Sequence, residues 1–113
     1  MDKNPQKYLE HIMASINNIE QIVQKHPKRF DYFCSDVCYN SAIKYQIAII
    51  GEAMNQLKKV APEISITNSR KIIDTRNYII HAYDSLNNDI LWSIVINHLD
   101  NLKKEISSLL TSH

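Results

Sequence analysis

The chain has 113 residues, of which 44% are hydrophobic and 22% charged, and its formal net charge is +1 at pH 7. This length predicts one domain spanning residues 1–113, and the charge excludes the strong positive field of a general nucleic-acid binder. One glycine and three prolines leave few of the residues that β-turns need, so we expect an all-α protein.

The sequence also predicts the cellular location of the protein. No apolar run approaches the roughly 20 residues needed to span a bilayer, and the N-terminus lacks the apolar region of a signal peptide. Two cysteines, Cys34 and Cys38, are too few for a disulfide framework. We therefore expect both to be reduced, as cysteines of cytosolic proteins usually are. We therefore expect a soluble, cytoplasmic protein without a membrane segment.

Apolar residues recur every three or four positions in four segments, which predicts four amphipathic helices. These helices are expected at residues 5–25, 35–60, 69–83 and 88–110. Their N-caps are expected among polar residues, namely Ser35 or Asp36, Asn68 or Ser69, and Asn87 or Asn88. The sum predicts an antiparallel up-and-down four-helix bundle, with a short extra helix near residues 30–34.

The second of these helices is apolar over an unusually wide arc. Beside its main stripe of isoleucines it carries a second stripe of Tyr45, Ala48, Ile49 and Ala53, so it must be covered at the bundle centre or by an oligomer interface. Gly51 stands in the middle of this helix, where glycine costs roughly 1 kcal/mol relative to alanine. Such a glycine indicates the close approach of another backbone.

The third helix carries the residues with chemical potential. On a helical projection Arg76 falls within an arc of isoleucines, and Tyr83 lies two turns above Arg76. Asn77 and His81, four residues apart, flank this stripe. Those isoleucines are Ile72, Ile73, Ile79 and Ile80. A guanidinium on a face that should be buried needs a partner, because desolvating it costs several kcal/mol.

Two interpretations of this segment stay open. In the first, Arg76 forms an internal ion pair with Glu52 or Asp84, and His81 is an ordinary hydrogen-bonding residue. In the second, the segment cleaves RNA without a metal or another cofactor. His81 would then move protons, Arg76 would stabilise the charge of the phosphorane-like transition state, and Asn77 would orient the imidazole or hold a phosphate.

The same residues carry a resemblance to a known family. The segment resembles the Arg-x4-His-x-Tyr motif of the HepT-like proteins, a branch of the HEPN superfamily, with its elements at Arg76, His81 and Tyr83. Upstream, Ile50-Gly51-Glu52-Ala53 is similar to that family's Ile-Gly-Glu-Ala segment. The proline turn at Pro62 and the tryptophan at Trp92 also match, so the resemblance covers nearly the whole chain.

The resemblance implies a helical bundle that forms a homodimer, with the two motif segments facing a shared cleft. It implies a ribonuclease toxin of a toxin–antitoxin pair, with Arg76 and His81 as catalytic residues supported by Asn77 and Glu52. The antitoxin would be a minimal nucleotidyltransferase of the MntA type, which silences the toxin by transferring AMP onto Tyr83. RNA and this antitoxin are thus the expected partners.

Other classes of function remain compatible with the sequence. The domain could be a non-catalytic nucleotide-binding or partner-docking module of a nucleotidyltransferase complex, with the polar segment serving only for docking. A purely structural helical adaptor is also conceivable, but it leaves the position of Arg76 unexplained.

Overall fold

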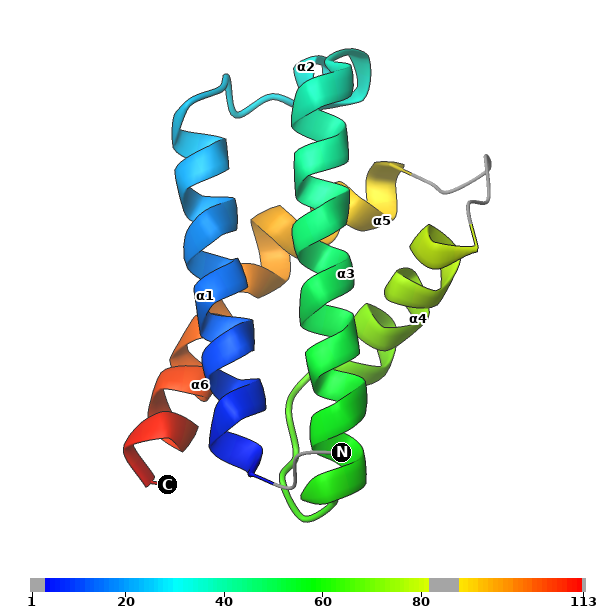
Figure 1. The fold of residues 1–113 in the computed structure, drawn as a ribbon. Helices are drawn as coiled ribbons and strands as arrows, with labels where there is room; N and C mark the ends of the chain where they lie inside the picture. Colours follow the sequence, from blue (N-terminus) through cyan, green and yellow to red (C-terminus); the bar gives the residue numbers. More distant parts are fainter. Residues whose placement is uncertain (1–3, 82–87, 113) are drawn as a thin grey trace.

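The chain is all-α over the residues that the computed structural model describes, 4–81 and 88–112, as Figure 1 shows. This confirms the all-α prediction. The elements in order are α1 (Pro5–Gln24), α2 (Phe30–Ser35), α3 (Val37–Val60), α4 (Ser69–Ile80), α5 (Asn88–Ser93), a π-helical turn η1 (Ile94–His98) and α6 (Leu99–Ser112).

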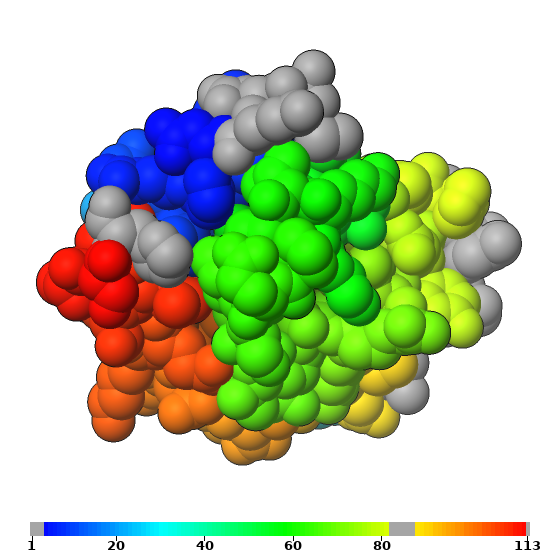
Figure 2. All heavy atoms as spheres, turned by 90° about the horizontal axis from the view of Figure 1, so that it is seen from below, coloured from blue at the N-terminus to red at the C-terminus, as the bar shows by residue number. Residues whose placement is uncertain are grey.

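The long helices pack as the expected bundle, and α2 is the expected short extra helix. α1 and α3 lie antiparallel side by side, α4 packs against the other side of α3, and α6 passes behind α1 (Figure 1). Seen from below, the end of α3 and the connection after it fill the space between α1 and α6 on one side and α4 on the other (Figure 2). α3 therefore lies between α4 and the pair formed by α1 and α6, and it connects these two parts of the bundle.

The core is built almost entirely from aliphatic side chains of the predicted stripes. Its completely buried members include Leu9, Ile12, Ile16, Ile19, Ile43, Ile47, Leu91 and Ile106. Within the described residues, none of the helices is long and apolar enough to cross a membrane.

The expected N-cap forms at the start of α3, but no side-chain cap forms at the start of α4. Asp36 caps α3 by accepting a hydrogen bond from the Tyr39 backbone N–H at 2.9 Å, which also lowers the pKa of the Asp36 carboxyl. Asn68 stands at the N-cap of α4, but its backbone is left-handed, with φ of 63°, and its side chain makes no capping bond. Its amide instead meets Nδ1 of His98 at 3.3 Å, so a tertiary contact replaces the expected cap.

The last predicted helix is one helical segment with a change of pitch. Residues Ile94–His98 form a π-helical turn between α5 and α6. The prediction assumes the α-helical period of about 3.6 residues throughout, so it does not locate this wider i→i+5 turn. Here it lies where His98 meets α4.

The upper end of the bundle is closed by aromatic side chains. Trp92 of α5 packs against Phe33 of α2, with ring centroids 5.1 Å apart, and edge-on against Tyr39 of α3. His26 stacks on the other side of Tyr39 at 4.3 Å. This cluster joins three helices and the turn after α1, so Trp92 anchors α5 to α2 and α3.

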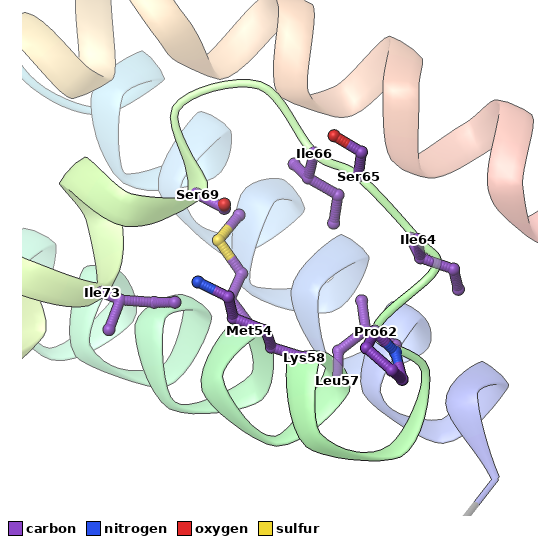
Figure 3. Close-up of a pocket in the computed structure, with 9 residues that line it drawn as sticks. All are labelled: Met54, Leu57, Lys58, Pro62, Ile64, Ser65, Ile66, Ser69 and Ile73. Carbon is purple, nitrogen blue, oxygen red and sulfur yellow. The ribbon is translucent and has the colours of Figure 1, made fainter.

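The lower end contains a small cavity of about 270 Å³ between α3 and the connection to α4 (Figure 3). Met54, Leu57 and Lys58 of α3 line one side, and Ile64 and Ile66 of the connection line the other. The apolar side chains of the connection thereby hold the start of α4 against α3.

The crossing of α3 and α4 depends on Gly51. A Cβ built on Gly51 would overlap Cβ of Arg76 and would lie 3.1 Å from the backbone oxygen of Ile72. Real Cβ atoms do not approach so closely, so α4 can take this position only against a residue without a side chain. The close approach that the mid-helix glycine indicates is therefore confirmed, and the approaching residue is Arg76.

Replacement of Gly51 by alanine tests this crossing. Alanine favours the helix by roughly 1 kcal/mol, but forcing α4 outward costs typically 1–3 kcal/mol, so we expect Gly51→Ala to be destabilising. Urea unfolding followed by circular dichroism measures the difference. Ser41→Ala, on the exposed side of α3, is the matched control and should change stability by less than about 0.5 kcal/mol. A Gly51→Ala protein as stable as the wild type would contradict the close crossing.

Candidate functional site

A groove of about 340 Å³ opens between α1, α3 and α4, and we call it the Arg76 groove. Its floor and walls are mainly apolar, and its polar side chains come from all three helices. They are Tyr8 and His11 of α1, Glu52 and Gln56 of α3, and Arg76 of α4. A mostly apolar groove with a few converging polar groups is the usual form of a binding site.

Arg76 is fixed in this groove by two neighbours. Its Nη1 donates a hydrogen bond of 2.7 Å to Oδ1 of Asn77, and its Nη2 forms an ion pair with Oε2 of Glu52. Gln56 donates to Oε1 of Glu52 at 3.0 Å and so holds the carboxylate in turn. Of the four candidate residues described, three are therefore joined by polar contacts, with Arg76 between Glu52 and Asn77.

The pair of Arg76 and Glu52 is only partly withdrawn from water. The side chain of Arg76 is 22% exposed and that of Glu52 is 44% exposed. Ion pairs with this exposure contribute roughly 0–1 kcal/mol to stability, so the effect of Glu52 on orientation outweighs its effect on folding. A guanidinium carries five N–H donors, and the two contacts above engage one at each terminal nitrogen. The fork can therefore also bind an anion in the groove.

The apolar stripe around Arg76 is less buried than the sequence indicates. Ile72 is buried, but Ile80 is 51% exposed and lines the groove beside Arg76. The expectation that this whole face is covered is thus wrong for a single chain. Ile80 is the last residue of α4, and its side chain is half exposed at this end of the helix.

His81 lies at the C-terminal end of α4, where it is exposed. Its backbone N–H donates to the Asn77 carbonyl at 3.2 Å, so it continues the helical path. Five residues along a helix correspond to a rotation of about 140°, so Arg76 and His81 leave α4 in different directions. Arg76 and His81 of one chain are therefore not placed side by side by this helix.

Two residues of the predicted segment, Tyr83 and Asp84, lie outside the described residues. Glu52, one of the two partners expected for Arg76, does pair with it.

His11 and Gln56 belong to the groove but are absent from the sequence-based site. His11 is exposed on α1, next to the ring of Tyr8, and lines the same groove as Arg76. Its position on the flank of the apolar stripe of α1 is visible in the sequence. Only the packing of α1 beside α3 shows that this flank faces Arg76.

Within residues 4–81 and 88–112, no three His, Cys, Asp or Glu side chains are grouped as ligands for one ion. The polar groups that line the Arg76 groove are a guanidinium, an imidazole, a carboxylate, a side-chain amide and two phenols.

The chain is similar to known proteins over nearly its whole length. The family model described as "Ribonuclease HepT-like" matches residues 12–109. A protein of Thermococcus cleftensis, described as a probable ribonuclease HepT, is 30% identical over 113 residues, covering 96% of this chain and 98% of the relative. A candidate RNase of Caldanaerobacter subterraneus subsp. tengcongensis is 28% identical over 109 residues and covers 96% of both chains.

A further candidate RNase, from Methanocaldococcus jannaschii, is 27% identical over 112 residues, covering 96% of this chain and 88% of the relative. No solved structure matches the chain. The family match spans well over half of the chain and includes α3 and α4, which form most of the Arg76 groove. This chain belongs to the ribonuclease HepT-like family.

Proposed function

We propose that the protein is a metal-independent endoribonuclease and the toxin half of a toxin–antitoxin pair. The observation that carries the proposal is the guanidinium of Arg76, oriented by Glu52 and Asn77 at a partly open groove. The names of the three relatives, each described as a ribonuclease or RNase, support the same activity.

In the proposed reaction the ribose 2′-OH attacks the neighbouring phosphorus, and the bond to the 5′-oxygen of the next nucleotide breaks. One group must take the proton of the 2′-OH, and another must give a proton to the leaving oxygen. His81 performs one of these transfers, because an imidazole can accept or donate a proton near neutral pH. Arg76 binds the nonbridging oxygens, whose negative charge grows in the transition state.

The active form is proposed to be a homodimer. Tyr45 is 66% exposed and Ile80 is 51% exposed, and both line the Arg76 groove together with Ala48 and Ile49. We call these four residues the Tyr45 patch. A second copy covering this patch would remove apolar surface from water and close the groove. It would also supply a second α4 helix, so that Arg76 of one copy need not act with His81 of the same copy.

Control of the activity is proposed to act at Tyr83. A cognate minimal nucleotidyltransferase would transfer AMP to this phenol, which follows the motif histidine by two residues. The phosphate introduced in this way is an anion that can pair with Arg76, and the nucleotide would block the site sterically.

A second candidate function rests on the apolar lining of the same groove. Tyr45, Ile49 and Ile80 would suit a docking surface for a protein partner, with Arg76 and Glu52 fixing its orientation. In this case the protein would be a non-catalytic module of a nucleotidyltransferase complex. It would bind its partner or a nucleotide and leave RNA intact.

Substitution of the two proposed catalytic residues separates these functions. We expect Arg76→Ala to lower the rate of RNA cleavage by about 100-fold or more. The variant lacks the guanidinium that would donate hydrogen bonds to the nonbridging oxygens, whose negative charge grows in the transition state. His81→Ala should lower it by roughly 10²–10⁴-fold through loss of a proton-transfer group. Initial rates on unstructured RNA, measured with and without EDTA, provide the test.

Arg29→Ala is the matched control, since that arginine pairs with Asp31 in α2 and is not among the residues that line the Arg76 groove. Its rate should equal the wild-type rate. Wild-type rates in the Arg76→Ala/His81→Ala double variant would exclude the proposed mechanism, and loss of cleavage in EDTA would exclude metal independence.

The dimer is tested by placing charge in the Tyr45 patch. Tyr45→Glu combined with Ile80→Glu should convert the dimer into a folded monomer, because burying two carboxylates at an interface is costly. Size-exclusion chromatography with light scattering measures the mass. Ile96→Glu is the control, since Ile96 is 38% exposed on η1, away from the patch. A double variant that stays dimeric would show that this patch is not the interface.

The regulatory step is tested by intact-mass measurement after co-expression with the nucleotidyltransferase. We expect mass increments of whole AMP groups that map to Tyr83, together with loss of RNA cleavage. Tyr83→Phe should remain unmodified, whereas Tyr78→Phe should still be modified. Unmodified wild-type protein in the presence of an active nucleotidyltransferase would contradict the proposal.

A further inference from the structure

A second groove lies on the side of α4 that faces away from the Arg76 groove. It has a volume of about 490 Å³, and its lining includes Arg70, Lys71, Asp74 and Tyr78 of α4 and Ile90 of α5. We call it the Tyr78 groove. Around α4, Tyr78 and Ile80 point about 160° apart, so a partner on the Tyr45 patch would leave the Tyr78 groove open.

The charged and aromatic residues of this groove form a row along α4. Arg70, Asp74 and Tyr78 line the groove at intervals of four residues, which places them above one another on one face. His81, three residues after Tyr78, does not line the groove but continues the row on the same face. The row is about 16 Å long from Arg70 to His81. A chain lying in the groove would therefore be led toward the proposed catalytic histidine.

Lys71 is held at the edge of this row by His98. Its Nζ lies 3.3 Å from Nε2 of His98, while the Asn68 amide meets Nδ1 at the same distance. Burial, and secondly the charge of Lys71, lower the pKa of His98, which favours a neutral imidazole beside the ammonium. The contact orients the Lys71 amine and leaves its positive charge uncompensated there.

The remaining residues complete a site for a polyanion with exposed bases. Nε of Arg70 is 3.9 Å from Asp74, and these side chains are 81% and 58% exposed, so this pair is weak and a phosphate can compete for the arginine. Tyr78 is 51% exposed, and an exposed phenol ring is a surface on which a nucleobase stacks. Two cations beside an aromatic ring are typical of single-strand binding sites.

We propose that the Tyr78 groove binds the single-stranded RNA that adjoins the cleaved bond, with Arg70 and Lys71 on phosphates and Tyr78 stacked on a base. This inference rests on the proposed ribonuclease function and adds the path of the substrate to it. Arg70, Lys71 and Asp74 together carry one net positive charge, so stacking and position contribute more here than overall charge.

Cleavage kinetics on a long unstructured RNA and on a dinucleotide test the groove. For the long RNA, Tyr78→Leu should raise KM roughly 5- to 100-fold through lost stacking, with kcat unchanged, whereas Tyr78→Phe should behave as wild type. Lys71→Ala should also raise KM, and it should lower the slope of log KM against log salt by about 1. Cleavage of the dinucleotide, which is too short to fill the groove, should not change.

Lys59→Ala is the matched control, because Lys59 is an exposed lysine at the end of α3 and does not line this groove. It should leave both substrates unaffected. Circular dichroism melting of every variant separates lost binding from lost folding, and Lys71→Met keeps the aliphatic stem of the lysine if alanine disturbs His98.

Each outcome decides one of the two proposals. Wild-type kinetics in both groove variants, or equal losses on the long RNA and the dinucleotide, would overturn the RNA path and leave the ribonuclease function intact. If the wild type cleaves no RNA, the proposed function fails, and fluorescence anisotropy with intact RNA then tests the groove alone. Variants that lose the nucleotidyltransferase but keep RNA would assign the groove to a protein partner and overturn the proposal.

Discussion

The crossing of α3 over α4 at Gly51 is the contact on which the rest of the site depends. Because Gly51 has no Cβ, Arg76 can lie directly against α3, and the next residue along α3, Glu52, is then within reach of the guanidinium. Gln56, one turn further, supports the carboxylate. A single small residue thus decides both how the helices pack and which way the arginine points.

Much of this arrangement can be predicted from local patterns. The apolar periodicity locates the four long helices, Asp36 marks the start of α3, and the costly glycine indicates a close contact. These predictions succeed because each depends on residues close together in the sequence. A carboxylate partner for Arg76 is also expected, with Glu52 and Asp84 as the alternatives, since a partly buried guanidinium requires an anion, and Glu52 does pair with it.

Features that depend on the packing of distant segments are not accessible in this way. The apolar periodicity identifies the buried side of α1, but it does not show that His11 lines the Arg76 groove together with residues of α3 and α4. Asn68 has the composition of a capping residue, yet His98, 30 residues later, takes its side chain. Likewise, an arc of isoleucines does not reveal that Ile80, the last residue of α4, is half exposed.

The aromatic cluster at the upper end of the bundle has a consequence for spectroscopy. Trp92 is the only tryptophan of the chain, and its ring lies against Phe33 and Tyr39. Tyr39 precedes Gly51 by 12 residues on α3, a separation of about 18 Å along the helix axis. The indole is therefore an intrinsic fluorophore at a distance from the Arg76 groove, and a ligand there would alter its emission only by moving a helix.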